Sequence, residues 1–223
     1  MSAGAVVMAA GAGRRMGGRP KALLLREGEP LLLRQIRLLA QAGVTDAVVV
    51  LGHHAAQLAQ VLEQARLPPG MRVRRVVNPA PDAGPGSSLR CGLTALPADL
   101  PLLLVTLGDL PLLEAADVQT VAQAWHARPP GVDLVLPQHE GQPGHPIALG
   151  TAVREAVMRA NDGEGVREWR RVHPARVQFI EVSHARYTTD VDTPADLERL
   201  RRTYGVALEW PAALQSGNHH CAG

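Results

Sequence analysis

The residues best suited to chemistry lie between positions 9 and 21, where a glycine-rich run ends at Lys21. Lys21 is the only lysine, although lysine and arginine together number 23. Glycines leave backbone N–H groups accessible, and the lysine ammonium is a compact point charge, unlike the planar fork of arginine. The combination predicts a phosphate-binding loop with Lys21 as its cation.

Two common glycine motifs do not match this run. Gly11-Ala12-Gly13 begins like a dinucleotide-binding loop, but Met16 stands where the third glycine belongs, and no acidic residue follows the second predicted strand. Gly13 and Gly18 have the spacing of a P-loop, but Arg19 follows where that motif needs lysine. The run therefore indicates a different kind of phosphate site.

The elements that position this loop alternate along the chain. Apolar runs typical of strands occupy 5–10, 47–51, 73–77, 102–107 and 134–137, and amphipathic stretches typical of helices occupy 31–42, 55–65, 88–96 and 115–127. This alternation predicts one α/β domain, doubly wound in three layers, with a mainly parallel sheet. Ligands bind at the carboxyl ends of such strands, where the glycine loop and Asp109 both fall.

The second half continues with weaker signals. A glycine- and proline-containing break at 138–145 precedes a short apolar segment, and the remaining elements are expected as helices at 151–160 and 165–172, a strand at 177–182 and a last helix from Pro194, capped by Asp192-Thr193. We expect a domain over 1–204 and a flexible tail over 205–223. His219, His220 and Cys221 in that tail are adjacent ligands at a terminus, which leaves a metal site incomplete.

Composition excludes several classes of protein. The chain has 223 residues, 46% hydrophobic content and a net charge of +2, with only 3% aromatic residues. Such a chain can bury a full core, but it lacks the basic blocks and stacking surface of a nucleic-acid binder. Two cysteines do not form a disulfide framework, and neither a signal peptide nor a membrane-length apolar run is visible. We expect a cytoplasmic protein that binds neither nucleic acid nor membrane.

Arg15-Met16-Gly17 and Pro20-Lys21 complete a pattern of strand, glycine loop and helix. This pattern resembles the signature loop of the molybdenum cofactor nucleotidyltransferase family (MobA/MocA-like), whose fold is that of the nucleotide-diphospho-sugar transferases. The resemblance implies that the loop wraps a nucleoside triphosphate, with Arg15 and Lys21 as the catalytic cations. The nucleotide-binding residues that it implies in the loop are Ala9, Ala10, Gly11 and Gly13.

Later segments carry the same resemblance. Asp109-Leu110-Pro111 resembles the family's magnesium-binding element, and Asp190-Val191-Asp192 resembles the element that completes the metal site, for which we favour Asp192 over Asp190. The resemblance implies Mg²⁺ as cofactor. It also implies nucleotide contacts from Ser87 and Ser88, for which an ordinary helix cap is the alternative, and acceptor-side roles for Asn78 and His145, although a loop histidine bonded to backbone stays open.

The resemblance implies a reaction and its partners. Ala9-Ala10-Gly11 is similar to the loop of members that use CTP, whereas Ala-Gly-Gly is typical of those that use GTP. The expected activity is transfer of CMP from CTP to the phosphate of a molybdopterin-type cofactor, with release of pyrophosphate, the product passing to a molybdenum enzyme. The alternatives are a cytidylyl- or guanylyltransferase acting on a sugar or polyol phosphate, and a non-catalytic accessory protein that delivers cofactor to a molybdenum enzyme.

Overall fold

A single mixed sheet forms the centre of the computed structural model, which describes residues 3–161 and 164–215. Its strand order is β10-β7-β9-β6-β1-β4-β5, with β8 paired to β7. Strands β6, β1, β4 and β5 run parallel, as do β7 and β10, whereas β9 is antiparallel to β6 and β7. The strands are β1 (Ala3–Ala9), β4 (Asp46–Leu51), β5 (Arg72–Val77), β6 (Leu102–Leu107), β7 (Leu134–His139), β8 (Gln142–Pro143), β9 (Ile147–Leu149) and β10 (Val177–Glu181).

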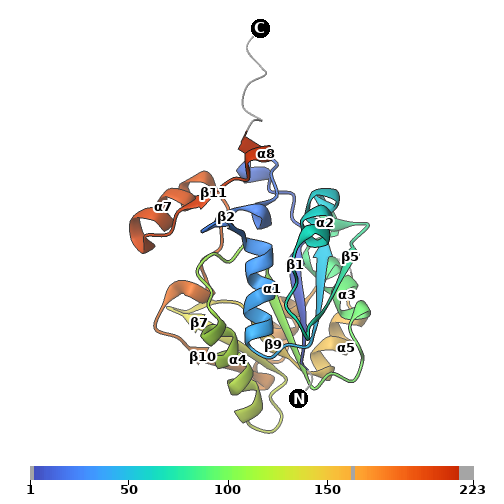
Figure 1. Ribbon diagram of the computed structural model, residues 1–223. Helices are drawn as coiled ribbons and strands as arrows, with labels where there is room; N and C mark the ends of the chain where they lie inside the picture. Colours follow the sequence, from blue (N-terminus) through green and yellow to red (C-terminus); the bar gives the residue numbers. More distant parts are fainter. Residues whose placement is uncertain (1–2, 162–163, 216–223) are drawn as a thin grey trace.

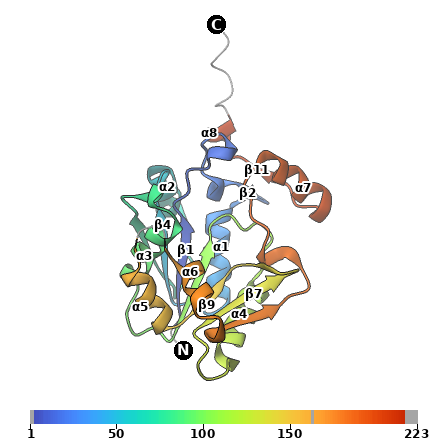
Figure 2. The same cartoon turned by 180° about the vertical axis from the view of Figure 1, so that it is seen from behind.

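Helices cover both faces of this sheet (Figures 1 and 2). Alternate side chains of β1 point to opposite faces: Ala5 and Val7 pack with one set of helices and Val6 with the other. The first set is α1 (Leu31–Gln41), α2 (Ala55–Gln64) and α4 (Ala115–Ala127). The second set is α3 (Pro85–Ala95), α5 (Thr151–Arg159) and α6 (Val166–Val172). The predicted three-layer α/β fold with a mainly parallel sheet is confirmed.

A small antiparallel sheet pairs an early segment of the chain with a late one. Its order is β11-β2-β3, from β2 (Leu25–Arg26), β3 (Glu29–Pro30) and β11 (Leu208–Glu209). Beside it, α7 (Pro194–Tyr204) closes a third apolar cluster whose buried members are Met16, Leu24, Leu31, Leu112, Val191 and Leu200. Met16 is only 1% exposed, so the glycine loop is anchored in a core of its own.

The domain extends past the boundary expected at residue 204. Val206, Leu208 and Trp210 pack against the third apolar cluster, and α8 (Ala212–Gln215) follows. Leu214 of α8 packs against the main core as well, so the segment from Val206 to Leu214 belongs to the packed structure rather than to a flexible tail. The His219-His220-Cys221 segment lies outside the described residues. No helix within the described part of the chain is both long and apolar enough to cross a membrane.

Candidate active site

The glycine loop after β1 is closed by its own backbone. Gly13 adopts a left-handed conformation, with φ of 62°, and its carbonyl oxygen accepts the N–H groups of Met16 at 2.8 Å and Gly18 at 3.0 Å. A Cβ at position 13 would lie 2.0 Å from the carbonyl oxygen of Arg19. Both the conformation and this close approach require glycine.

Lys21 lies between two carboxylates from distant parts of the chain. It begins the short 3-10 helix η2 (Lys21–Leu23), and its Nζ is 2.6 Å from Asp109 Oδ2 and 2.7 Å from Asp192 Oδ1. The Arg15 guanidinium pairs with the other oxygen of Asp192. The Lys21 and Asp109 side chains are 18% and 14% exposed, whereas that of Arg15 is 68% exposed. The structure thus brings together four residues predicted to carry catalysis and metal binding.

Burial and pairing set the charges of this cluster. Burial opposes the charge of Lys21, but Asp109 and then Asp192 outweigh it and raise its pKa. Burial likewise opposes the charge of Asp192, but Lys21 and Arg15 outweigh it and lower its pKa. For Asp109, burial is the stronger influence and raises its pKa against the attraction of Lys21. The site is a compact group of charges that compensate one another in a low-dielectric hollow.

Asp190 lies beside this group. Burial, followed by the nearby Asp109 and Asp192 carboxylates, raises the pKa of Asp190. It lines the same cavity as Lys21 and Asp109, but Asp192 is the residue that contacts Lys21 directly. The geometry therefore favours Asp192 over Asp190 as the partner of Asp109.

The start of α7 fixes Asp192 in place, and its N-cap is one of the two residues expected there. Thr193 is the N-cap, and the Asp196 carboxylate accepts the backbone N–H groups of Asp192 at 3.0 Å and Thr193 at 2.7 Å. This is a capping box, in which the side chain at N3 reaches back to the backbone N–H of the N-cap and here also to that of the residue before it. Of the expected cap Asp192-Thr193, Thr193 is therefore confirmed as the N-cap, whereas the Asp192 carboxylate is engaged by Lys21 and Arg15 instead.

We expect Asp196→Ala to destabilise the protein by about 1 kcal/mol at neutral pH, since a helix cap is worth this much. Hydrogen bonds from Thr193, then from Asp192, outweigh burial and lower the pKa of Asp196. Its contribution is therefore complete above about pH 3.9, the unfolded value, and is lost as the pH falls through the lower folded pKa. Urea denaturation at pH 7 and pH 3 measures this difference. An equal difference between wild type and variant at both values would contradict it.

Two adjoining cavities open at this end of the sheet. The first, of about 250 Å³, holds Lys21, Asp109 and Asp190 and is bounded by Gly11 of the glycine loop. The second, of about 460 Å³, contains His145. Three residues line both cavities, namely Met8, Pro85 and Leu107. The pair of cavities offers adjacent space for a phosphate chain and for a second substrate.

A buried hydrogen-bond network connects the end of β5 with α3 and consists of Asn78, Ser87 and Ser88. Asn78 Nδ2 donates to Ser87 Oγ at 2.8 Å and Ser88 Oγ at 2.9 Å, and Asn78 Oδ1 accepts the N–H of Ala80 at 2.9 Å. Ser87 Oγ lies 2.9 Å from the carbonyl oxygen of Gly84 as a donor. These side chains shape the loop, and the structure does not bring them to the cavity walls. The same turn reaches the walls through Pro85, Gly86 and Leu89.

His145 faces the larger cavity as a neutral imidazole. Its Nδ1 is 3.2 Å from the carbonyl oxygen of Val105, which can only accept, so Nδ1 carries the proton. Burial lowers the pKa of His145. With the ring neutral and Nδ1 protonated, Nε2 is left as a hydrogen-bond acceptor. His145 thus lines the larger cavity, whereas Asn78 lines neither of the two cavities.

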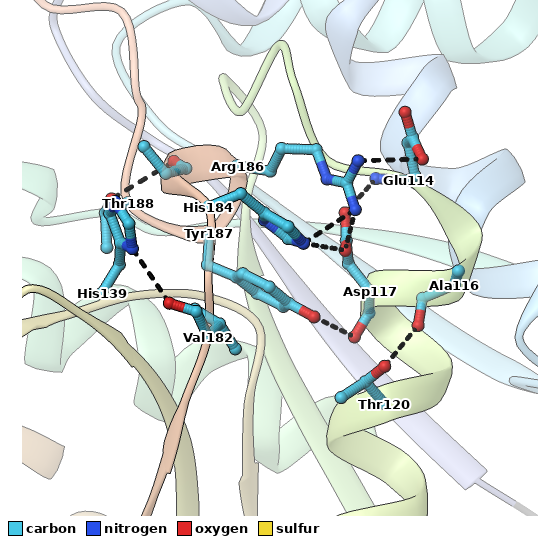
Figure 3. Close-up of polar contacts among 11 residues, drawn as sticks. Glu114, Ala116, Asp117, Thr120, His139, Val182, His184, Arg186, Tyr187 and Thr188 are labelled. Carbon is cyan, nitrogen blue, oxygen red and sulfur yellow. Dashed lines mark hydrogen bonds and ion pairs between the residues drawn. The ribbon is translucent and has the colours of Figure 1, made fainter.

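A polar cluster that sequence reasoning missed surrounds Arg186 and Tyr187 (Figure 3), and the backbone of Tyr187 also contacts His145. The His145 N–H donates to the carbonyl oxygen of Tyr187 at 2.8 Å. Tyr187 ends the 3-10 helix η5 (Ala185–Tyr187), where Arg186 pairs with the buried carboxylate of Asp117 at 3.0 Å. Tyr187 also stacks on His184, with ring centroids 5.3 Å apart. Asp117 and Arg186 are 69 positions apart, so no local spacing announces their pairing.

Sequence reasoning also assigned nothing to the histidines after β4. His53 Nε2 lies 3.2 Å from Asp82 Oδ1, which also pairs with Arg14 at 3.0 Å, and His54 Nε2 lies 3.0 Å from the carbonyl oxygen of Ala12. These contacts tie the outer edge of the glycine loop to the loops after β4 and β5. Arg14 is therefore turned toward Asp82 rather than toward Lys21.

Comparison with known sequences assigns the family. The sequence model described as the MobA-like NTP transferase domain matches residues 5–177, more than half of the chain. The protein belongs to this MobA-like nucleotidyltransferase family. Asp190 and Asp192 lie beyond the matched segment, so their place in the site comes from the structure.

Relatives of this MobA-like protein carry different names. The bifunctional protein GlmU of Mycobacterium ulcerans is 32% identical over 183 residues, which cover 80% of this chain but only 37% of GlmU. The nicotine blue oxidoreductase of Paenarthrobacter nicotinovorans is 33% identical over 202 residues, covering 87% of this chain and 94% of that protein. The crystal structure of Mycobacterium tuberculosis Rv0371c has a TM-score of 0.73 and 25% identity, covering 91% of this chain and all of that one.

The residues of this MobA-like site fit a divalent cation. Nucleotidyltransferases of the family use divalent metals, and Rv0371c has also been solved in complex with manganese. Here the Asp109 and Asp192 carboxylates both reach one cationic atom, Lys21 Nζ, so an ion placed between them finds two oxygen ligands. The described residues contain no group of three or more His, Cys, Asp or Glu that could hold a metal. Two carboxylates supplemented by substrate phosphates are typical of Mg²⁺ rather than of an all-protein cage.

Proposed function

We propose that this protein transfers CMP from CTP to the phosphate of a molybdopterin-type cofactor and releases pyrophosphate. The observation that carries the proposal is that Lys21 Nζ lies 2.6 Å from Asp109 and 2.7 Å from Asp192, beside the cavity that Lys21 and Asp109 line together with Gly11 of the glycine loop. Membership of a nucleotidyltransferase family supports the reaction class. Mg²⁺ is the proposed metal, held by Asp109 and Asp192.

The chemistry is attack of an acceptor phosphate oxygen on the α-phosphorus of the nucleotide. A new P–O bond forms while the bond from the α-phosphorus to the bridging oxygen breaks, and its electron pair leaves with pyrophosphate. Such transfer depends on alignment and charge neutralisation more than on covalent help. Lys21, Arg15 and the N–H groups of the glycine loop neutralise charge on the phosphates, and the metal, when bound, adds positive charge at their oxygens.

The larger cavity favours a heterocyclic acceptor over a sugar. Most of its walls are apolar, formed by Met8, Leu89, Val105, Leu107, Leu136, Ile147 and Val166. Burying an unpaired hydroxyl costs about 1–3 kcal/mol, so a polyol with several hydroxyls is disfavoured against these walls. His145 Nε2 can accept one N–H or O–H from a planar ring, and Arg167 and Arg170 can attract an acceptor phosphate. These features support a pterin-like acceptor.

The base preference is proposed to depend on Ala10. Its methyl packs with the cluster on the α3 side of the sheet, whereas that of Ala9 packs on the α1 side. We expect Ala10→Gly to shift the ratio of kcat/KM for CTP over GTP toward GTP by about tenfold or more, since one methyl group is worth this much discrimination. Ala9→Gly removes a methyl group from the wall of the smaller cavity and is the comparison variant, for which we expect a smaller shift of the ratio. Equal shifts in both variants would contradict this assignment.

The test of the proposed function is incubation of the protein with Mg²⁺, molybdopterin and α-labelled CTP or GTP. We expect label transfer to the pterin and release of pyrophosphate with CTP, and neither with glucose 1-phosphate or methylerythritol 4-phosphate as acceptor. Transfer of the label to a sugar phosphate would identify that compound, instead of the pterin, as the acceptor. A non-catalytic delivery protein would bind nucleotide or pterin without turnover, and its biological activity would survive Asp109→Ala.

A second candidate function is oxidoreduction, because the nicotine blue oxidoreductase relative matches over 94% of its length. Against it stands the absence, from the loop sequence, of the dinucleotide-binding pattern. Oxidation of NADH or NADPH by this protein in the presence of a quinonoid dye, without Mg²⁺, would favour this candidate over nucleotidyl transfer.

A further inference from the structure

Arg19, at the far edge of the glycine loop, is held by a residue from the end of the described chain. Its guanidinium carbon lies 4.3 Å from the ring centroid of Trp210. On its other side, Arg19 Nε donates to the carbonyl oxygen of Met16 at 3.1 Å. A cation over a tryptophan face is attracted by the ring's quadrupole. Arg19 is thus engaged by Trp210 and by its own loop, rather than by the carboxylates around Lys21.

The position of Arg19 fixes both ends of the glycine loop. The Arg19 carbonyl oxygen lies against Gly13, where an added Cβ would come within 2.0 Å of it. The Gly13 carbonyl oxygen in turn accepts the N–H groups of Met16 and Gly18. Arg19 also stands two positions before Lys21. A shift of Arg19 would therefore disturb the loop closure and the start of η2 together.

Trp210 is itself fixed to the segment that follows Lys21. It comes directly after β11, where Leu208 pairs with Arg26 and Glu209 with Leu25. Its carbonyl oxygen accepts Gln215 Nε2 at 2.6 Å, and its side chain packs against the third apolar cluster. Because that cluster contains Met16 and Val191, the same segment packs against both the glycine loop and the loop before α7 that carries Asp192.

We infer that Trp210 is a positioning residue, which keeps the glycine loop in the form that receives a triphosphate. A glycine-rich loop loses more conformational freedom on ordering than other loops do, and an already ordered loop binds without that cost. Trp210 keeps the glycine loop ordered through its contact with Arg19, and it lines neither of the two cavities. The inference rests on the proposed function only in that the ligand is a nucleoside triphosphate.

The first test measures the loop without any ligand. Hydrogen exchange of amides 13–18 is expected to accelerate about tenfold in Trp210→Ala relative to wild type, and to stay within about twofold in Trp210→Phe, which keeps an aromatic face. Tyr204→Ala is the matched control, because this exposed aromatic residue ends α7 and belongs to none of the apolar clusters around the loop. Unchanged exchange in Trp210→Ala overturns the inference, whatever the protein's activity.

The second test measures nucleotide affinity by calorimetry with α,β-methylene-CTP and Mg²⁺. Trp210→Ala and Arg19→Gln are each expected to raise Kd about tenfold, and the double variant to raise it no further, because both act through one contact. Arg19→Gln keeps Trp210 and its packing, so it still tests the inference if Trp210→Ala lowers the melting temperature of the protein. Additive effects of the two substitutions on Kd, or wild-type affinity in both single variants, would overturn this inference and leave the proposed function standing. No binding by the wild-type protein of this analogue or its guanosine counterpart overturns the proposed function as well.

Discussion

Lys21→Ala is expected to lower kcat by about 100- to 1,000-fold, since loss of one preorganised charge donor costs about this much in transition-state stabilisation. The ammonium is the cation shared by Asp109 and Asp192, at 2.6 and 2.7 Å. Lys21→Arg is not expected to restore the rate, because the planar guanidinium is larger and cannot occupy the same position between two carboxylates. Single-turnover kinetics with labelled CTP measures the effect.

Removal of Lys21 has a second expected result that separates its role from mere stability. In the free protein its ammonium occupies the place between the two carboxylates where a divalent ion fits. Lys21→Ala should therefore bind Mn²⁺ more tightly than wild type in the absence of nucleotide, as measured by electron paramagnetic resonance. Arg159→Ala, which removes an exposed ion pair with Glu155 on α5, is the charge-matched control and changes neither quantity. Weaker Mn²⁺ binding in Lys21→Ala would contradict this reading of the site.

Asp109→Asn is expected to lower metal-dependent turnover by about 1,000-fold or more, since a metal ion contributes several kcal/mol to transition-state charge stabilisation. The side chain is 14% exposed and faces Lys21, so the substitution keeps shape while removing the charge that holds the cation. Nucleotide affinity measured without metal should change little. Mg²⁺ titration of turnover measures the loss, and a high Mg²⁺ concentration should recover only part of it.

Comparison among the aspartates sharpens this prediction. Asp192→Asn should resemble Asp109→Asn, whereas Asp190→Asn should cost less, because Asp190 lines the cavity without contacting Lys21 directly. Asp133→Asn removes a carboxylate that pairs with Arg176 outside the site and is the control. A larger loss from Asp190→Asn than from Asp192→Asn would exchange their roles.

The local parts of the fold were predictable from the sequence. Apolar runs predicted strands β1, β4, β5, β6 and β7 close to their observed bounds, and amphipathic stretches did the same for helices α1 to α4. Such elements can be read from the sequence because side-chain periodicity is a property of neighbouring residues. The turn around Ser87 and Ser88 was also visible, but their hydroxyls could as well face a ligand as the interior. Asn78 decides this, since it binds both hydroxyls from nine and ten positions away.

The sequence by itself determined the glycine loop, the single lysine and the strand ends at which ligands gather. Only the tertiary structure decided that Lys21 meets Asp192 across 171 positions, that Asp196 completes the capping box of α7, and that Trp210 lies on Arg19. The reason is physical: local patterns fix which residues share a face, whereas contacts between loops depend on the order of strands in the sheet. That order, with β6 beside β1 and residues 206–210 folded back onto β2, arises from burial of the whole chain.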